Sequence, residues 1–355
     1  MDSTYFFLKK LGLLSINGHS YIKGLSNGSA LSAIYSNGDY KVVVKFLINP
    51  RNYVELERFK LEYSVLKCNY INSYWTANGY KPFSKRENYE DDGTYPLPKI
   101  VVPMYHSHDN YINYFGYNYE EGILLSDYDT SKYSIEDKVL LTTRVASALN
   151  YFTMSGYVHR DLHPNNILIL DSPKMYLVPP LPRVMILDLG NCQRDSKHPS
   201  EDTPFKLVRD LDESAVFNDN NKRILSSFTS MPPDFLIHGG NTKNYDSWAI
   251  GIYFYELVFD EKPFEVNEIG DVVKLVSYPF LPLDVERNLS TLKPGLNLLL
   301  RSLLNVHGER RPTTDAIVRL FNFYLNDKDF EQDYNDYAKK ILKDNGNDYD
   351  GIPED

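Results

Sequence analysis

The chain is 355 residues long, which is enough for a sizeable hydrophobic core and for two lobes or domains. Its formal net charge of −10 argues against a protein that coats nucleic acid, and it weakly favours basic peptides as partners. The two cysteines, Cys68 and Cys192, cannot build a disulfide framework and indicate a reducing compartment, so we expect a cytoplasmic protein. No apolar run approaches the roughly 20 residues that span a bilayer, and no membrane span is expected.

The first predicted elements are β-strands. Residues 22–30 hold Gly24 and Gly28 between two strand-like stretches, and glycines let a backbone approach phosphate groups because they lack a Cβ atom. An Asn-Gly hairpin turn is the alternative for this segment. Residues 40–47 predict a strand because they are rich in β-branched side chains. Lys45 lies in the apolar centre of that strand, where an unpaired ammonium group is costly unless it snorkels from a strand edge.

Residues 54–67 predict an amphipathic helix, because apolar side chains recur at helical spacing on one face and charged side chains cover the rest. Lys45 requires a carboxylate partner from this helix, and we expect Glu55 and Glu57 to face solvent instead. Residues 68–99 are rich in Tyr and Asn and are predicted to be an exposed insertion. A further strand is predicted over residues 122–125.

The next elements enclose a short polar loop. A helix is predicted to start at Ser134, and an apolar run over residues 167–170 predicts a strand. Between them lie residues 159–166, with Asp161 and Asn166 five positions apart. Phosphoryl transfer from ATP needs such a pair, because an acid must orient the attacking hydroxyl and an oxygen ligand must hold magnesium. A polar turn would explain any one of these residues but not their order.

Further along the chain, residues 184–187 predict a buried strand that ends at Asp188-Leu189-Gly190. A carboxylate at a strand end followed by glycine suits a magnesium ligand, although Asp-x-Gly alone is a common turn. Residues 245–257 predict a mostly apolar helix with Asp246 at its start. The tail, residues 326–355, is acidic, and its end is expected to be disordered.

The polar loop His-Arg-Asp-Leu-His-Pro-Asn-Asn fits the signature H-R-D-L-x-x-x-N, and the chain from residue 21 to residue 325 resembles the eukaryotic-type protein kinases. Lys45 resembles the lysine of the family's V-A-I-K strand, and Glu62 its paired glutamate. The triplet that begins at Asp188 resembles Asp-Phe-Gly, with Leu in the middle position. His163 stands where serine/threonine kinases usually carry a phosphate-contacting lysine.

The resemblance implies an α+β, bilobal, protein-kinase-like fold. The N-lobe would be β-rich with one key helix over residues 1–127, including the insertion at 68–99. The C-lobe would be mainly helical over residues 128–325, followed by the tail. The C-lobe would contain an insertion at 171–183 and a long activation segment over 188–234. Within that frame, Ser126-Asp127-Tyr128 is predicted to cross the hinge, with Ser126 at the back of the adenine pocket.

The resemblance also implies residue roles. ATP and Mg²⁺ are the expected cofactors, and Asn166 and Asp188 are the expected magnesium ligands. Nucleotide binding is assigned to Gly24, Gly28, Ala30, Val43, Lys45, Ser126, Asp127 and Leu168. Catalysis is assigned to Asp161, Lys45, Glu62, Arg160 and His163.

The resemblance further implies two pairings in the C-lobe. Asp246 would hold the backbone of the catalytic loop, and Arg311 would pair with Asp234, with both ends of the guanidinium engaged. Arg160 would bind a phosphate in the activation segment after autophosphorylation. The candidate acceptors in that segment are Ser196, Ser200, Thr203, Ser214, Ser226, Ser227, Thr229 and Ser230.

The resulting interpretation is an ATP- and magnesium-dependent protein kinase of the serine/threonine type that acts on a protein substrate. One alternative is a small-molecule kinase, because residues 161–166 also resemble the D-L-H-P-G-N loop of aminoglycoside and choline kinases. Arg160, the helix that begins near Asp246 and the pair of Asp234 with Arg311 oppose it. A second alternative is a pseudokinase scaffold that binds nucleotide without turnover, favoured by the altered glycine loop and by His163.

Overall fold

The computed structural model describes residues 2–25, 31–38, 40–77, 97–154, 157–170, 183–194, 231–235, 244–267, 269–277 and 281–326. The chain divides into two compact units. The first comprises Met1–Glu121 with Leu187–Asn191, and the second comprises Gly122–Ile186 with Cys192–Asp355. The boundary follows Glu121 rather than Asp127, because the strand that begins at Gly122 pairs within the second unit.

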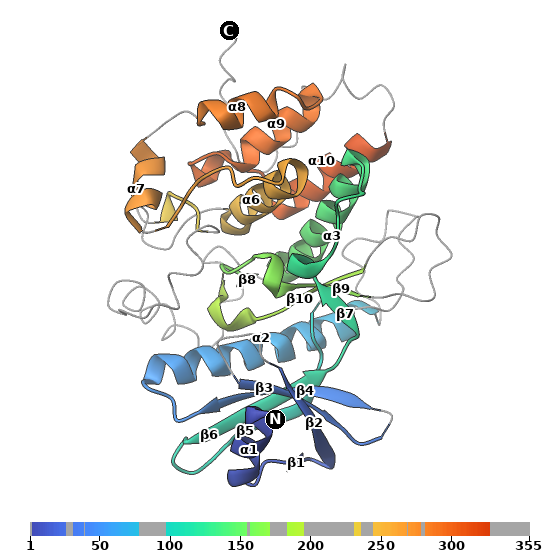
Figure 1. Cartoon of the computed structure of the whole chain (residues 1–355), viewed down its shortest axis with the longest axis vertical. Helices are drawn as coiled ribbons and strands as arrows, with labels where there is room; N and C mark the ends of the chain where they lie inside the picture. Colours follow the sequence, from blue (N-terminus) through green and yellow to red (C-terminus); the bar gives the residue numbers. More distant parts are fainter. Residues whose placement is uncertain are drawn as a thin grey trace. The chain divides into compact units, whose positions relative to one another are not determined.

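The first unit is built on a six-stranded antiparallel sheet with the strand order β1-β2-β3-β4-β6-β5 (Figure 1). Its strands are β1 (Ser15–Ile16), β2 (His19–Leu25), β3 (Leu31–Ser36), β4 (Lys41–Ile48), β5 (Ile100–His106) and β6 (Ile112–Asn118). Its described residues also form two α-helices, α1 (Ser3–Lys10) and α2 (Tyr53–Ala77). The predicted strand over residues 40–47 and the predicted helix over residues 54–67 are both present.

The two faces of β4 carry different environments, because side chains alternate along a strand. Val44 is buried on one face, in an apolar cluster that includes Leu8 of α1. Lys45 lies on the other face and is paired in register with Phe115 of β6. The ring of Phe115 packs against Phe59 of α2, with 4.9 Å between the ring centroids. The sheet therefore separates a purely apolar core from the face that carries the lysine.

The helices of the first unit differ from the prediction in two ways. α1 was not expected; it forms because Asp2 caps its N-terminus, accepting hydrogen bonds from the backbone N–H groups of Thr4 at 3.0 Å and Tyr5 at 3.4 Å. α2 continues to Ala77, into the segment predicted as an exposed insertion. The rest of that segment, up to residue 96, lies outside the described residues.

The second unit is mainly helical. Its longer helices are α3 (Ile135–Met154), α6 (Tyr245–Phe259), α7 (Ile269–Ser277), α8 (Leu283–Leu289), α9 (Pro294–Leu303) and α10 (Thr314–Asn326). The predicted start of α3 is confirmed, because Ser134 and Asp137 exchange backbone and side-chain hydrogen bonds in a capping box. α6 is buried along most of its length and packs against α3 and α9, so it forms the centre of the unit.

Short strands of the second unit fix both ends of the polar loop. β7 (Gly122–Leu124), β9 (Ile167–Leu170) and β10 (Arg183–Ile186) form a sheet in the order β10-β9-β7. β8 (Tyr157–Val158) precedes the loop and pairs with β11 (Gln193–Arg194), and β9 follows the loop directly. The predicted strands over residues 167–170 and 184–187 therefore form, the latter one residue earlier.

The predicted α+β organisation is confirmed: the first unit is built on a β-sheet and the second is mainly helical. Residues 171–182, 195–230 and 327–355 lie outside the described residues, and so do the predicted insertion that begins at 171, most of the activation segment and the tail. Among the helices that are described, none has the length and apolar character to cross a membrane.

Candidate active site

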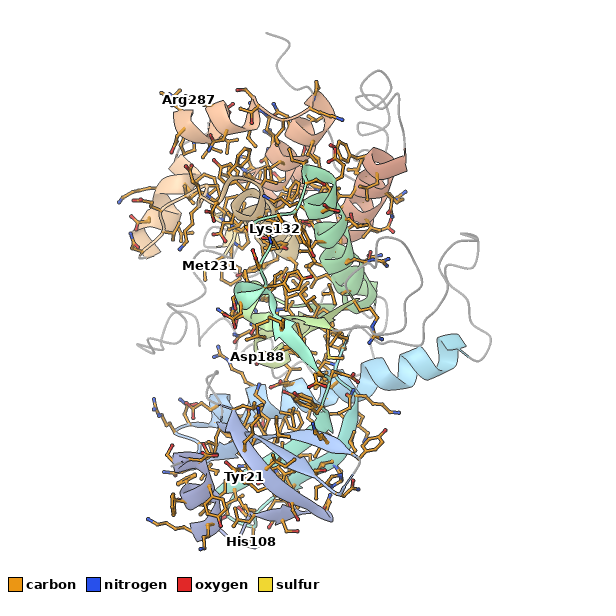
Figure 2. All side chains as sticks on the ribbon, turned by 45° about the vertical axis from the view of Figure 1, so that its right-hand side comes forward. Tyr21, His108, Lys132, Asp188, Met231 and Arg287 are labelled. Atoms are coloured by element: carbon orange, nitrogen blue, oxygen red, sulfur yellow. The ribbon has the colours of Figure 1, made fainter. Side chains whose placement is uncertain are left out.

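Lys45 lies at the centre of the candidate site in the first unit. Its Nζ atom is 2.7 Å from Oε2 of Glu62 and 2.8 Å from Oδ1 of Asp188, and its side chain is 11% exposed. Lys45 comes from β4 and Glu62 from α2, whereas Asp188, labelled in Figure 2, follows β10 along the chain. Two carboxylates thus hold one buried ammonium group, and the predicted pairing of Lys45 with Glu62 is present.

The charges of this cluster shift the pKa values of its members. Burial by itself would lower the pKa of Lys45, but the carboxylates of Asp188 and Glu62 raise it above its ordinary value. Burial raises the pKa of Glu62, and the positive charge of Lys45 acts in the opposite direction. With one ammonium group and two carboxylates, the cluster suits a divalent cation that arrives together with phosphate groups.

The turn that carries Asp188 is held by α2. Asp188 has a positive φ of 55°, a conformation that Asp adopts more readily than most residues. The backbone N–H of Leu189 lowers the pKa of Glu62, and the side chain of Leu189 is buried. The leucine in the middle of the triplet is therefore a packing residue, and Glu62 lies beside both the lysine and the turn.

Tyr117 of β6 belongs to the same neighbourhood and was not predicted from the sequence. Burial raises the pKa of its phenol, Lys45 lowers it, and Glu62 and Asp188 raise it further. Tyr117 is the register partner of Val43, so both lie on the face of the sheet that carries Lys45. The alternation of side chains along residues 112–118 would predict Tyr117 on this face only if the pairing of this strand with β4 were already known.

The predicted glycine loop is only partly described. Gly24 lies in β2, where its N–H donates to Oδ2 of Asp2 at 3.0 Å. A Cβ atom at Gly24 would lie 2.6 Å from Oγ1 of Thr4, so the missing side chain makes room for α1. This contact differs from the phosphate contact that was predicted for Gly24. Gly28 and Ala30 lie outside the described residues. Val43 is buried, and it lies two residues before Lys45 on the same face of β4.

In the second unit, Asp246 holds the backbone of the polar loop. Its Oδ2 atom accepts a hydrogen bond from the N–H of His159 at 2.8 Å, and its Oδ1 atom accepts one from the N–H of Arg160 at 2.9 Å. Arg160 has a positive φ of 66°, which is unfavourable for a residue with a long side chain. The predicted contact between Asp246 and the loop backbone is confirmed, and it stabilises this conformation next to Asp161.

Asp161 and Asn166 lie together within the loop. Both are buried, at 8% and 7% exposure, and the side-chain Nδ2 of Asn166 donates to the backbone oxygen of Asp161 at 2.9 Å. The N–H of Asp161 donates to Nδ1 of His159 at 3.2 Å. His163 contributes a further contact, with its Nε2 atom 3.0 Å from Nδ2 of Asn166. The loop thus brings together three of the residues predicted for catalysis and metal binding: Asp161, His163 and Asn166.

The side chain of Arg160 lies against aromatic rings. Its guanidinium carbon is 4.9 Å from the ring centroid of Phe235 and 5.8 Å from that of Tyr245. Such cation–π contacts contribute roughly 0.5–1 kcal/mol each at exposed sites and about 2 kcal/mol when they are desolvated. The hydroxyl residues with which Arg160 was predicted to interact after phosphorylation, at positions 196–230, lie outside the described residues.

The predicted pair of Asp234 and Arg311 is present and fully buried, with 2.8 Å between Oδ1 and Nη2. The expectation that both ends of the guanidinium engage the carboxylate is wrong. Oδ2 of Asp234 accepts instead from the N–H of Gly308 at 2.9 Å, and Nη1 of Arg311 donates to the backbone oxygen of Asn305 at 2.8 Å. Each partner is therefore satisfied by one ionic contact and by backbone groups.

Ser126 and Asp127 lie after the boundary between the two units rather than across it, as had been predicted for the hinge. Both lie in a single 3₁₀ turn, Leu125–Asp127, that follows β7 within the second unit, and both side chains are exposed. The turn therefore does not connect the two units, and the role of Ser126 at the adenine pocket stays a prediction. Leu168 lies in β9, paired in register with Met185 and Leu124, and is partly buried.

The side chains predicted to hold magnesium are of a suitable kind. Asp188 of the first unit offers a carboxylate and Asn166 of the second offers a carboxamide oxygen, and Mg²⁺ prefers oxygen ligands. No group of three or more His, Cys, Asp or Glu side chains that could hold a metal ion occurs in the part of the chain that the structure describes.

Comparison with known proteins identifies similar chains. The family model described as the protein kinase domain matches residues 96–321. A probable serine/threonine-protein kinase of Dictyostelium discoideum is 28% identical over 137 residues, which is 38% of this chain and 27% of that protein. A serine/threonine-protein kinase of Saccharomyces cerevisiae is 27% identical over 182 residues, 50% of this chain and 19% of that protein. Aurora kinase B of Drosophila melanogaster is 27% identical over 179 residues, which is 48% of this chain and 42% of that protein.

The chain therefore spans less than half the length of each of these relatives. The family match begins at residue 96, so it includes Asp161, Asn166, Asp188 and Asp246 but not Lys45 or Glu62. The contacts of Lys45 with Glu62 and Asp188 are consequently an observation separate from the family match.

Proposed function

The chain belongs to the protein kinase family, and on that premise we propose that it transfers the γ-phosphoryl group of ATP to a hydroxyl group of a protein substrate. The observation that carries the proposal is the buried contact of Lys45 with both Glu62 and Asp188. An ammonium group held between two carboxylates from distant parts of the chain has no evident role in packing the sheet. Such an ammonium group can orient phosphate groups, and it can orient the carboxylate that binds their metal ion.

In this proposal Lys45 orients the α- and β-phosphates and Glu62 fixes its direction. The backbone N–H of Leu189 lowers the pKa of Glu62, so Glu62 also lies beside the turn at Asp188. Asp188 and Asn166 supply oxygen ligands to magnesium, which neutralises charge on the phosphate groups when it is bound. Catalysis then consists mostly of positioning and charge stabilisation.

Asp161 is proposed to orient the substrate hydroxyl and to accept its proton. It is nearly buried, and the loop backbone beside it is fixed by Asp246, which keeps the carboxylate at a defined place. A carboxylate at hydrogen-bond distance from a hydroxyl can accept a proton late in the transfer. Autophosphorylation on the activation segment forms part of the proposal and depends on the same chemistry.

A serine or threonine hydroxyl of a protein is the proposed acceptor, because two of the relatives above are named as a probable serine/threonine-protein kinase and a serine/threonine-protein kinase. Two buried contacts favour a protein kinase over a small-molecule kinase: Asp246 with the loop backbone, and Asp234 with Arg311. The intact contacts of Lys45 favour turnover over a scaffold that binds nucleotide without transfer.

A substrate panel with radiolabelled ATP and Mg²⁺ tests this function. The panel contains basic proteins, aminoglycosides and choline, and the enzymes compared are the wild type, Lys45→Met and Lys132→Met. Lys132 is an exposed lysine of the second unit, labelled in Figure 2, and serves as the matched control. We expect label on proteins, on the order of 10²-fold less with Lys45→Met, and no change with Lys132→Met. Label on a small molecule alone, or nucleotide binding without any transfer, would contradict the proposal.

A further inference from the structure

The carboxamide of Asn166 is held in one orientation by its surroundings. Its Nδ2 atom lies 2.9 Å from the backbone oxygen of Asp161. A carbonyl oxygen can only accept a hydrogen bond, so the side of the amide that faces Asp161 must be the nitrogen. The oxygen Oδ1 therefore points away from that carbonyl.

The Nδ2 atom of Asn166 also determines which ring nitrogen of His163 carries the hydrogen. Nε2 of the ring lies 3.0 Å from Nδ2 of Asn166, and an amide nitrogen can only donate. Nε2 must therefore accept, which leaves the ring neutral with its hydrogen on Nδ1. The distance of 3.9 Å from Nε2 to Oδ1 of Asp161 is too long for a hydrogen bond, as expected for two acceptors that face each other.

The backbone brings these two side chains together. His163 is extended, with φ −154° and ψ 164°, which is the conformation favoured before a proline. Pro164 then begins the 3₁₀ turn η2 (Pro164–Asn166), and the N–H of Asn166 donates to the backbone oxygen of His163 at 2.8 Å. The turn thereby fixes the distance between the imidazole and the carboxamide.

We propose that His163 is a positioning residue that orients the carboxamide of Asn166 toward magnesium, and not a cation that contacts phosphate. This inference rests on the proposed function, in which Oδ1 of Asn166 is a metal ligand. Both hydrogens of the amide are engaged, one by Asp161 and one by His163, so both lone pairs of Oδ1 remain for a metal ion. A lysine at position 163 could not do this, because an ammonium group accepts no hydrogen bond.

Removal of the acceptor should weaken the metal site rather than the nucleotide site. Without Nε2, one N–H of a nearly buried amide loses its partner, and the carboxamide gains freedom to rotate. Groups that orient a metal ligand from the second layer typically contribute 10- to 100-fold to metal affinity. We therefore expect a loss on the order of 10-fold in magnesium affinity.

Three variants separate positioning from charge. His163→Gln keeps an acceptor near the place of Nε2, His163→Lys supplies a cation without an acceptor, and His163→Ala supplies neither. His108→Ala, at an exposed histidine of the first unit that is labelled in Figure 2, is the matched control. Magnesium is titrated against the full chain with a non-hydrolysable ATP analogue, and binding is followed by thermal shift. The analogue alone, with EDTA, reports nucleotide binding.

If His163 positions Asn166, the Lys and Ala variants need about 10-fold more magnesium than the wild type, whereas the Gln variant and the control stay within about 3-fold. Binding of the analogue with EDTA is equal in all of them. A Lys variant that matches the wild type while the Gln variant fails would overturn the inference in favour of a phosphate-contacting cation. Equal magnesium affinity in all three variants would also overturn it.

The outcome for the wild type distinguishes this inference from the proposed function. A wild type that binds the analogue with magnesium and transfers phosphate, beside His163 variants of unchanged metal affinity, would refute only the role of His163. A wild type without magnesium-dependent binding would refute the proposed function, and the role of His163 with it.

Discussion

Replacement of Asp246 by asparagine should weaken the hydrogen bonds that join α6 to the backbone of the polar loop. The carboxylate accepts two backbone N–H groups, from His159 at 2.8 Å and from Arg160 at 2.9 Å, and is itself buried. Asparagine has one side-chain oxygen, so one of the two N–H groups would face the NH₂ group of the new side chain. The variant loses one charge-assisted hydrogen bond and leaves a donor without a partner.

The magnitude follows from these contacts. A hydrogen bond to a charged group contributes about 1.5–3 kcal/mol. The positive φ of Arg160, 66°, is an additional strain that the carboxylate helps to offset. We expect the free energy of unfolding to fall by about 2–4 kcal/mol. A shift of the loop also moves Asp161, and a displacement of about 1 Å can cost on the order of 10²-fold in turnover.

Urea unfolding and phosphotransfer measure the two effects. The control is Asp284→Asn, at an exposed aspartate in the first turn of α8, which should change the unfolding free energy by no more than about 0.5 kcal/mol. If Asp246→Asn unfolded like the control and kept wild-type turnover, the role assigned to Asp246 would be wrong.

Three further predictions concern other contacts. Gly24→Ala should destabilise the chain by about 1–3 kcal/mol in urea, because its Cβ atom would collide with α1; unchanged stability would contradict that packing. A hydrogen bond from Tyr21 is the main cause that lowers the pKa of Asp2 to about 2, below its ordinary 3.8. The ionised Asp2 therefore stabilises the folded chain above about pH 4, and this stabilisation is lost as the pH falls toward 2. The difference in melting temperature between wild type and Asp2→Asn should therefore narrow as the pH falls through that range, and a constant difference would refute this. Asp234→Ala should cost about 3–5 kcal/mol in urea by removing a carboxylate partner of the buried Arg311, whereas the exposed Arg310→Ala should be neutral; equal effects would be inconsistent with the buried pair.

The site residues were predictable where chemistry demands a fixed order along the chain. The five-residue spacing of Asp161 and Asn166 in the polar loop indicated a phosphoryl-transfer site before any fold was known. A lysine in an apolar strand implied a buried carboxylate partner, and the structure supplies Glu62. Both inferences depend on local sequence and on the cost of burying charge.

What remained hidden depends on contacts between distant segments. Tyr117 lies near Lys45 only because β6 pairs with β4, and that register is set by the folded sheet. α1 owes its place to Asp2, whose carboxylate accepts from Gly24 and from Tyr21, also labelled in Figure 2. The single contact between Asp234 and Arg311 likewise depends on a competing backbone N–H far along the chain.

Asp161→Ala removes the carboxylate that is proposed to accept the proton of the substrate hydroxyl. Phosphate incorporated into a protein substrate from Mg-ATP is counted by intact-mass spectrometry, and ATP binding is measured in parallel. We expect a loss of about 10²–10⁴-fold in turnover with ATP binding retained, because the proposed role of Asp161 is on the substrate hydroxyl and not on the nucleotide. Equal transfer by the wild type and the variant would contradict it.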